Sequence, residues 1–316
     1  MKKLLLGMLV SVVVAVVAAP APAQQLADQL PSEEELDEAT RIRLDVTRVN
    51  ILFTVTDKRG RFVTDLARED FEVFEKNDQQ NILEFSALSD LPLRLGILID
   101  TSNSIRDRFR FQQEAAIEFI NSVVRPDVDR AVVVSFDSSV NPVSELTGDP
   151  EALAESIREL RPGGGTALYD AILHTCRDKL MVDRPRHKFR RAIVILSDGE
   201  DNQSHYTRDQ ALEMAHRADA VLYTISTNIS RVQTTGDKVL KYYAEETGGL
   251  VFFPFKVEDL TQSFENIANE LRHQYNILYR PEPLEADGLY HPVRIRVKNQ
   301  KNLIVRARKG YYAPTF

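Results

Sequence analysis

The chain has 316 residues, of which 43% are hydrophobic, so it can bury a substantial core in one large domain or, as we expect, in two smaller ones. Its formal net charge of -7 at pH 7 argues against binding to nucleic acid or to an anionic lipid surface, because both need clustered positive charge. The single cysteine, Cys176, excludes an internal disulfide, and its place in a segment of helical apolar spacing predicts a buried side chain.

The first residues have the pattern of an export signal. Two lysines precede an apolar run over residues 4–19, and residues 21–23 have the small-x-small form of a cleavage site. We expect a signal peptide over residues 1–23 and an exported protein, periplasmic or extracellular; the alternative is an uncleaved N-terminal membrane anchor. An acidic linker is expected over residues 24–40, with a short acidic helix as the alternative there. After cleavage of the signal we expect no membrane span.

Two segments, at residues 41–90 and 273–316, alternate between apolar and polar positions, which is typical of antiparallel strands with one buried face. The expected strands lie at residues 49–55, 71–74, 82–85, 275–279, 293–297 and 303–305. The second and third of these should form a hairpin through a turn at residues 76–79. We expect the two segments to be the halves of one β-sandwich; the alternative is two separate β elements packed against a central domain.

The segment between them, at residues 91–272, alternates short apolar strands with segments of helical spacing. This predicts a doubly wound α/β fold with a mainly parallel sheet covered on both faces, inserted in or flanked by the β-sandwich. The expected strands lie at 93–99, 131–136, 192–196, 221–225 and 250–253, with a short edge strand at 141–146, and the expected helices lie at 111–124, 150–160, 167–180, 208–218, 238–246 and 257–271. If the domain is inserted, its first and last residues should lie close together.

Polar residues follow two of the apolar strands. Asp100, Ser102 and Ser104 come after the first central strand, Asp198 comes after the third, and Thr166 ends a glycine-rich loop. The carboxyl ends of parallel strands are where α/β sheets bind ligands. Carboxylate and hydroxyl oxygens suit a hard divalent cation such as Mg²⁺, with Mn²⁺ or Ca²⁺ as alternatives. The alternative role for the two serines is to cap the next helix by accepting hydrogen bonds from its free amide groups.

The order of these three loops resembles the metal-ion-dependent adhesion site (MIDAS) of von Willebrand factor A and integrin inserted domains. The resemblance implies that Ser102, Ser104 and Thr166 coordinate the ion directly, while Asp100 and Asp198 act through waters or as counter-charges. It also implies an open coordination position, filled by a glutamate or aspartate of a protein or peptide partner. We therefore expect a metal-dependent adhesion module with no catalytic residues, no organic cofactor and no enzymatic activity.

The flanking segments carry a second resemblance. Residues 70–77 with 80–82, and residues 308–314 at the end, are similar to the von Willebrand factor A-related proteins abundant in acidobacteria. This likeness covers nearly the whole mature chain. It supports the architecture and a bacterial origin more than any activity.

Two other functions remain as alternatives. In a metal-dependent phosphohydrolase Asp100 would be a nucleophile, but Ser102 stands where a second aspartate is usual, and no basic residue stands in the three loops to hold a phosphoryl group. In a structural envelope scaffold the site would have no metal-mediated partner.

Three further expectations follow from the residues beside and outside the site. Glu200 and Asp201 should be ordinary solvated charges; the alternative is that they tune the field at the site or repel competing anions. The six histidines have neither His-x-His nor His-x-x-x-His spacing, so no zinc site is expected. The sequence predicts neither the partner nor the oligomeric state.

Overall fold

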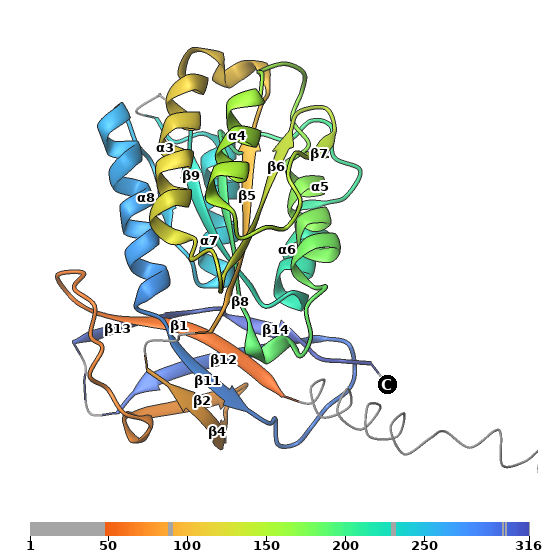
Figure 1. Cartoon of the computed structure of the whole chain (residues 1–316). Helices are drawn as coiled ribbons and strands as arrows, with labels where there is room; N and C mark the ends of the chain where they lie inside the picture. The colour runs from red at the N-terminus through yellow and green to blue at the C-terminus, as the bar shows by residue number, and fades with distance from the viewer. Residues whose placement is uncertain (1–47, 88–90, 229–231, 299, 301, 316) are drawn as a thin grey trace, which may run out of the picture. The chain divides into compact units, whose positions relative to one another are not determined.

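The structure is a computed structural model that describes residues 48–87, 91–228, 232–298, 300 and 302–315 (Figure 1). The expected signal peptide and acidic linker lie outside the described residues. Within the described part of the chain, no helix is long and apolar enough to cross a membrane.

A six-stranded sheet forms the centre of the α/β segment, in the order β10-β9-β8-β5-β6-β7 (Figure 1). All neighbours pair in parallel except β7, which pairs antiparallel with β6 at the edge, as Pro142 predicts. The six strands are β5 (Leu93–Asp100), β6 (Arg130–Phe136), β7 (Val140–Pro142), β8 (Arg190–Ser197), β9 (Ala220–Ser226) and β10 (Val251–Phe252). The expected mainly parallel sheet is confirmed.

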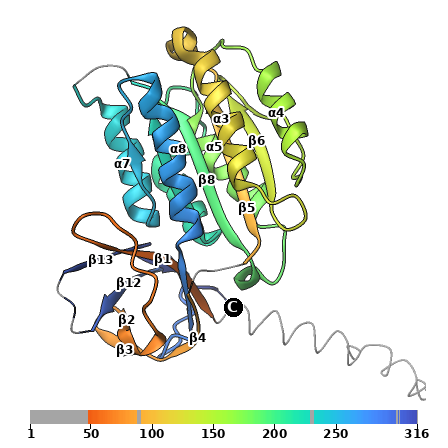
Figure 2. The same cartoon turned by 60° about the vertical axis from the view of Figure 1, so that its left-hand side comes forward.

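Helices cover both faces of this sheet (Figure 2). They are α3 (Phe109–Val123), α4 (Pro150–Glu159), α5 (Leu168–His174), α6 (Arg208–Arg217), α7 (Thr235–Thr247) and α8 (Val257–Arg272), with short helical turns η2 (Asn103–Arg108) and η4 (Arg186–Lys188). Alternate residues of β5 reach opposite faces: Ile97 packs in the core with α3 and α8, whereas Leu98 packs in the core with α5 and α6. The expected helix at residues 167–180 divides into α5 and a π-helical continuation, η3 (Thr175–Leu180). Cys176 lies there and is buried, as predicted.

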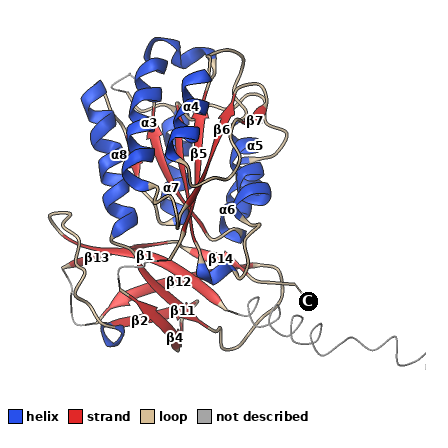
Figure 3. Cartoon of the chain, viewed as in Figure 1, coloured by secondary structure: helices blue, strands red, loops and turns tan. Residues whose placement is uncertain are grey.

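The remaining strands form two four-stranded antiparallel sheets, in the orders β13-β1-β11-β4 and β14-β12-β2-β3 (Figure 3). Their elements are β1 (Val49–Asp57), η1 (Arg68–Asp70), β2 (Phe71–Glu75), β3 (Asp78–Gln80), β4 (Ile82–Ser86), β11 (Tyr275–Tyr279), β12 (Tyr290–Val297), β13 (Leu303–Ala307) and β14 (Gly310–Tyr312). One apolar core lies between the sheets, and in it the ring of Phe53 packs 5.1 Å from that of Phe71 and 5.4 Å from that of Tyr275. Each sheet contains strands from both ends of the chain.

The hairpin expected between residues 71–74 and 82–85 is wrong. β2 turns back onto the short strand β3, and β4 crosses to the other sheet, where it pairs antiparallel with β11. Only one residue, Asn81, separates β3 from β4. The sequence pattern therefore predicted a single strand where the structure has two strands in different sheets. β14 was not expected at all, since three residues are too few to show an alternation.

Arg190, at the start of β8, lies beside both connections between the α/β segment and the antiparallel strands. Its guanidinium donates hydrogen bonds to the backbone carbonyls of Leu91 and Leu271. The chain therefore leaves the antiparallel sheets and returns to them at nearly the same place.

Candidate metal site

The candidate site lies at the point where the strand order reverses. The chain continues from β5 to β6 on one side, and later strands β8 and β9 lie on the other. In open α/β sheets a crevice forms outside the carboxyl ends of the strands at this point. The parallel register pairs Ile99 with Leu196, so Asp100 and Ser197 lie side by side at that end.

Asp100 is fully buried and hydrogen-bonded. Its carboxylate accepts a hydrogen bond of 2.7 Å from the Ser197 hydroxyl and one of 2.8 Å from the Ser102 amide. Burial raises the pKa of Asp100 to about 6, against the lowering effect of the Ser197 and Ser102 hydrogen bonds, and the charge of Asp198 raises it further. The geometry therefore concentrates negative charge in a place where water is excluded.

Ser102 and Ser104 lie directly beside this carboxylate. Their hydroxyl oxygens are 2.9 Å apart, with Ser102 buried and Ser104 exposed. Ser102 is the N-cap residue directly before η2 but makes no side-chain capping hydrogen bond, so the capping alternative is wrong for this residue. The two hydroxyls face each other at a distance that a shared ligand could bridge.

The glycine-rich loop is tied to both of the other loops by hydrogen bonds. The Gly163 amide donates to the Thr101 carbonyl at 2.6 Å, and the Thr166 amide donates to Asn202 Oδ1 at 3.0 Å. Thr166 is buried. A Cβ on Gly165 would lie 2.7 Å from Gln203 Cγ and 2.8 Å from Asn202 Oδ1, so a larger residue there would displace the Asn202 side chain that holds Thr166. Thr166 is thus held between the loops that carry Ser102 and Asp198.

The loop after β8 is shaped by its contact with the start of α7. Gly199 has φ +80°, and a Cβ there would lie 2.2 Å from the Gly236 carbonyl oxygen, so only glycine fits. Asp198, half-buried, accepts a hydrogen bond of 3.1 Å from the Glu200 amide. Glu200 in turn accepts one of 3.2 Å from the Gly236 amide, at the N-terminal end of α7.

One expectation beside the site needs correction. Asp201 is not a solvated charge, because its carboxylate accepts hydrogen bonds of 2.6 Å from the Ser204 hydroxyl and 3.1 Å from the Tyr169 amide. Glu200 is exposed but bound to Gly236, as described above. The three loops contain no basic residue, as expected, but Arg106 of η2 lies beside the first of them, where its guanidinium donates to Asn103 Oδ1 at 2.9 Å.

Sequence reasoning missed Ser197 and Asn202, which hold Asp100 and Thr166 in place. Ser197 directly precedes Asp198, so its position was visible in the sequence. Its partner was not, because the pairing of β5 with β8 brings together residues 97 positions apart. Asn202 reaches Thr166 across 36 positions in the same way.

Residues 95–200 match the family model of the von Willebrand factor type A domain. A comparison with curated proteins finds no significant match. Among solved structures the chain is similar to proximal thread matrix protein 1 of the mussel byssus, in a structure described as having a zinc-occupied MIDAS motif. The identity is 15% and the TM-score 0.50, over 62% of this chain and 50% of that one, so this chain spans about half the length of the mussel protein.

Two bacterial structures are also similar. The PilB minor pilin of Streptococcus sanguinis has 13% identity and a TM-score of 0.47, over 60% of this chain and 63% of that chain. BatB of Bacteroides thetaiotaomicron has 13% identity and a TM-score of 0.45, over 56% of this chain and 99% of that chain. At such identities the likeness to the mussel protein indicates a shared fold.

Proposed function

We propose that the chain is an exported protein-binding module in which Asp100, Ser102, Ser104, Thr166 and Asp198 hold a divalent cation that coordinates a carboxylate of a partner protein. The observation that carries this proposal is the pair of Ser102 and Ser104 hydroxyls, 2.9 Å apart beside the buried Asp100 carboxylate. Their position at the reversal of strand order, where α/β folds bind ligands, supports it further.

The donor set favours Mg²⁺, with Mn²⁺ or Ca²⁺ as alternatives. Ser102, Ser104 and Thr166 offer neutral hydroxyl oxygens, and Asp100 and Asp198 supply the negative charge that attracts a cation. Because the direct ligands are neutral, a bound dication keeps its attraction for an acidic side chain. Arg106, beside the same loop, adds a positive charge that favours a carboxylate partner.

The remaining assignments are part of the same proposal. The domain boundaries are residues 1–23 for a signal peptide, 24–40 for a linker, 41–90 and 273–316 for the sandwich halves, and 91–272 for the von Willebrand factor A domain. The likeness of the flanks to acidobacterial proteins belongs here too. The site is proposed to bind without catalysing a reaction.

Calorimetry tests the metal site. Titration of the full chain with Mg²⁺ and with Mn²⁺ should give binding that weakens at least about tenfold, or about 1.4 kcal/mol, in Asp100→Ala. The matched control is Asp149→Asn, which removes a carboxylate at the start of α4 but keeps its capping acceptor, and which should bind as the unaltered chain does. No difference between Asp100→Ala and the unaltered chain would refute the site.

Capture of native envelope proteins on the immobilised chain tests the docking role. Retention should require Mg²⁺ and should be lost with a chelator or in Asp100→Ala. Retention that is unaffected by either change would favour the scaffold alternative. Phosphatase turnover abolished in Asp100→Ala would favour the phosphohydrolase.

A further inference from the structure

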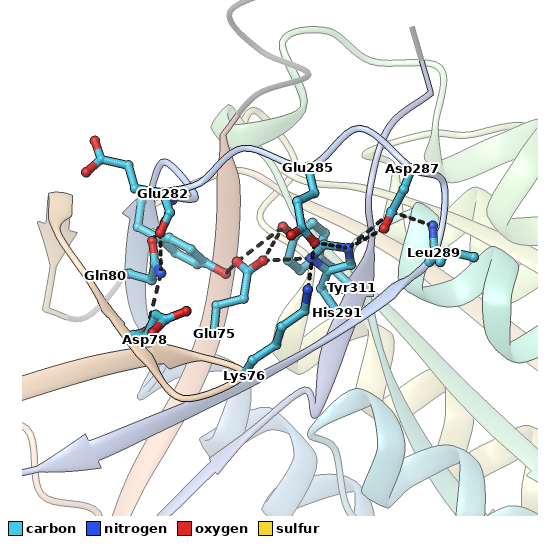
Figure 4. Close-up of polar contacts among 11 residues, drawn as sticks. Glu75, Lys76, Asp78, Gln80, Glu282, Glu285, Asp287, Leu289, His291 and Tyr311 are labelled. Carbon is cyan, nitrogen blue, oxygen red and sulfur yellow. Dashed lines mark hydrogen bonds and ion pairs between the residues drawn. The ribbon is translucent and has the colours of Figure 1, made fainter.

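A group of side chains that could ligate a metal ion lies where the loop between β11 and β12 meets β12, away from the candidate site. His291, on β12, points its Nε2 atom toward the carboxylates of Asp287 and Glu285 in the preceding loop (Figure 4). Nε2 is 3.1 and 3.3 Å from the two Asp287 oxygens and 3.7 Å from Glu285 Oε2. His291 is 2% exposed, whereas Asp287 is open to solvent.

The other ring nitrogen of His291 is fixed by a buried carboxylate. Nδ1 lies 2.7 Å from Glu75 Oε1, and Glu75 also accepts hydrogen bonds from the hydroxyls of Tyr279 at 2.9 Å and Tyr311 at 3.1 Å. An ionised carboxylate only accepts hydrogen bonds, so Glu75 favours the tautomer with the proton on Nδ1. Nε2, the nitrogen that would ligate a cation, then lies on the side of Asp287 and Glu285. A carboxylate behind a histidine in this way is the usual support of a metal-binding imidazole.

The charges of the cluster leave room for a cation. Glu75, Glu285 and Asp287 carry three negative charges, and Lys76 supplies one positive charge, with its Nζ 2.6 Å from Glu285 Oε2. Two negative charges therefore remain around the His291 ring. The carboxylates and Nε2 approach one another closely, which requires a positive charge between them: either a proton on Nε2, donated to Asp287, or a metal ion. A divalent cation would remove the excess.

The spacing of the three candidate ligands fits a tetrahedral ion. Zinc bonds to histidine nitrogen and carboxylate oxygen are about 2.0–2.2 Å long, so two ligands of one tetrahedral ion lie roughly 3.3–3.6 Å apart. The Nε2 distances of 3.1 Å to Asp287 and 3.7 Å to Glu285 lie on either side of that range. Small side-chain rotations would suffice, together with movement of the Lys76 ammonium away from Glu285.

We propose that Glu285, Asp287 and His291 bind a Zn²⁺ ion, with Glu75 as the positioning residue behind His291 and Lys76 as a competing charge. Three protein ligands leave a fourth position for water. The ion joins the loop after β11 to β12 and, through Glu75, to β2. The sequence showed no sign of this site, because two of its ligands are carboxylates and Glu75 lies 216 positions from His291.

The test uses the Asp100→Ala chain, so that zinc binding at the site of the proposed function does not interfere. Calorimetry with Zn²⁺, and the visible spectrum of Co²⁺ as its substitute, should show one ion with nitrogen and oxygen ligands. Asp287→Asn should weaken Zn²⁺ binding at least about 100-fold, because it removes a charged ligand. Asp287 is exposed, so this variant keeps the fold, and a melting curve checks that it does.

Three further variants separate a metal site from a network of ion pairs. Glu75→Gln should weaken Zn²⁺ binding about 10–100-fold and change the Co²⁺ spectrum, since it alters the orientation of His291. Lys76→Met should strengthen binding, because the competing ammonium is gone. Glu282→Gln is the matched control: Glu282 lies in the same loop, with its side chain pointing away from His291 (Figure 4), and should bind zinc unchanged.

The proposal is overturned if the Asp100→Ala chain takes up no Zn²⁺, or if uptake is the same in Asp287→Asn and Glu282→Gln. Failure of Mg²⁺ binding at Asp100 would leave this result untouched. The two sites are therefore tested independently.

Discussion

His216 is a neutral histidine enclosed where α6 meets β14. It is 3% exposed, and neither ring nitrogen has a hydrogen-bond partner among the described residues. Burial, followed by the charge of Arg308, lowers the pKa of His216 to about 3 from 6.5, against the raising effect of Asp219. The folded chain therefore resists a proton that the unfolded chain accepts.

Lowering the pH should destabilise the fold through His216. Between pH 6.5 and 3 the unfolded state binds more protons at His216, so the free energy of unfolding falls as the pH is lowered through this range. The slope from this residue is up to about 1.4 kcal/mol per pH unit. Urea unfolding at pH 7 and pH 5 measures it, with His216→Phe as the comparison. The variant should lose less stability than the unaltered chain between these two pH values; an equal loss contradicts the assignment.

Residues that carry the candidate site were visible in the sequence because their chemistry is local. Asp100, Ser102 and Ser104 follow an apolar strand, and their types and spacing alone indicate a hard cation. His291 was visible too, but its surroundings were not. Its partners Glu75 and Asp287 come from β2 and from a loop, and the close approach of these segments depends on how both sheets fold.

At the scale of elements, the contact between the loop after β8 and the start of α7 shapes the candidate site. We expect Gly199→Ala to destabilise the fold and to weaken Mg²⁺ binding, because its Cβ would collide with the Gly236 carbonyl and displace Asp198. The matched control is Gly60→Ala, which has almost the same φ, +79°, but nothing within 4 Å of a new Cβ.

The left-handed backbone alone costs alanine about 1–2 kcal/mol, so Gly60→Ala should lose that much stability and leave metal binding intact. Gly199→Ala should lose more, and should also bind metal more weakly. Urea unfolding and Mg²⁺ calorimetry on both variants measure the two effects. Equal losses in the two variants would mean that the contact with α7 is unimportant.

Strands and helices of the α/β segment were predictable because each buries a face with its own period. Which strands pair with each other was harder to predict from the sequence. β4 was expected to pair with β2, but it pairs with β11 because the chain crosses to the other sheet at Asn81, the one residue between β3 and β4. Likewise the π-helical end of α5 packs against β5, where a Cβ on Gly96 would lie 2.8 Å from Thr175 Cγ2.

At the scale of the whole molecule, an ion pair between a buried carboxylate and a partly exposed guanidinium joins α8 to the antiparallel strands. Glu270 of α8 is 1% exposed and accepts hydrogen bonds of 2.7 Å from both the Thr54 hydroxyl and the Arg306 guanidinium. Arg306→Ala should cost about 3–5 kcal/mol of unfolding free energy, because it leaves the Glu270 carboxylate buried without its counter-charge.

The double variant Arg306→Met with Glu270→Leu should recover most of that loss, since it removes both charges together. Urea unfolding of the single and double variants measures the coupling between the two residues. If the double variant is as unstable as Arg306→Ala, the pair is not coupled in this way.

The adjacency of the two connections at Arg190 has a mechanical consequence. β4 and β11 pair directly, with Ser86 opposite Asn276. This pairing joins the two strands that enter and leave the α/β segment, so force can pass between them without passing through that segment. Tension applied between Val49 and Tyr312 passes from strand to strand through the antiparallel ladders. The three loops around Asp100 lie outside that path. Tension between Val49 and Tyr312 therefore leaves the geometry of these loops unstrained until the hydrogen bonds between the antiparallel strands break.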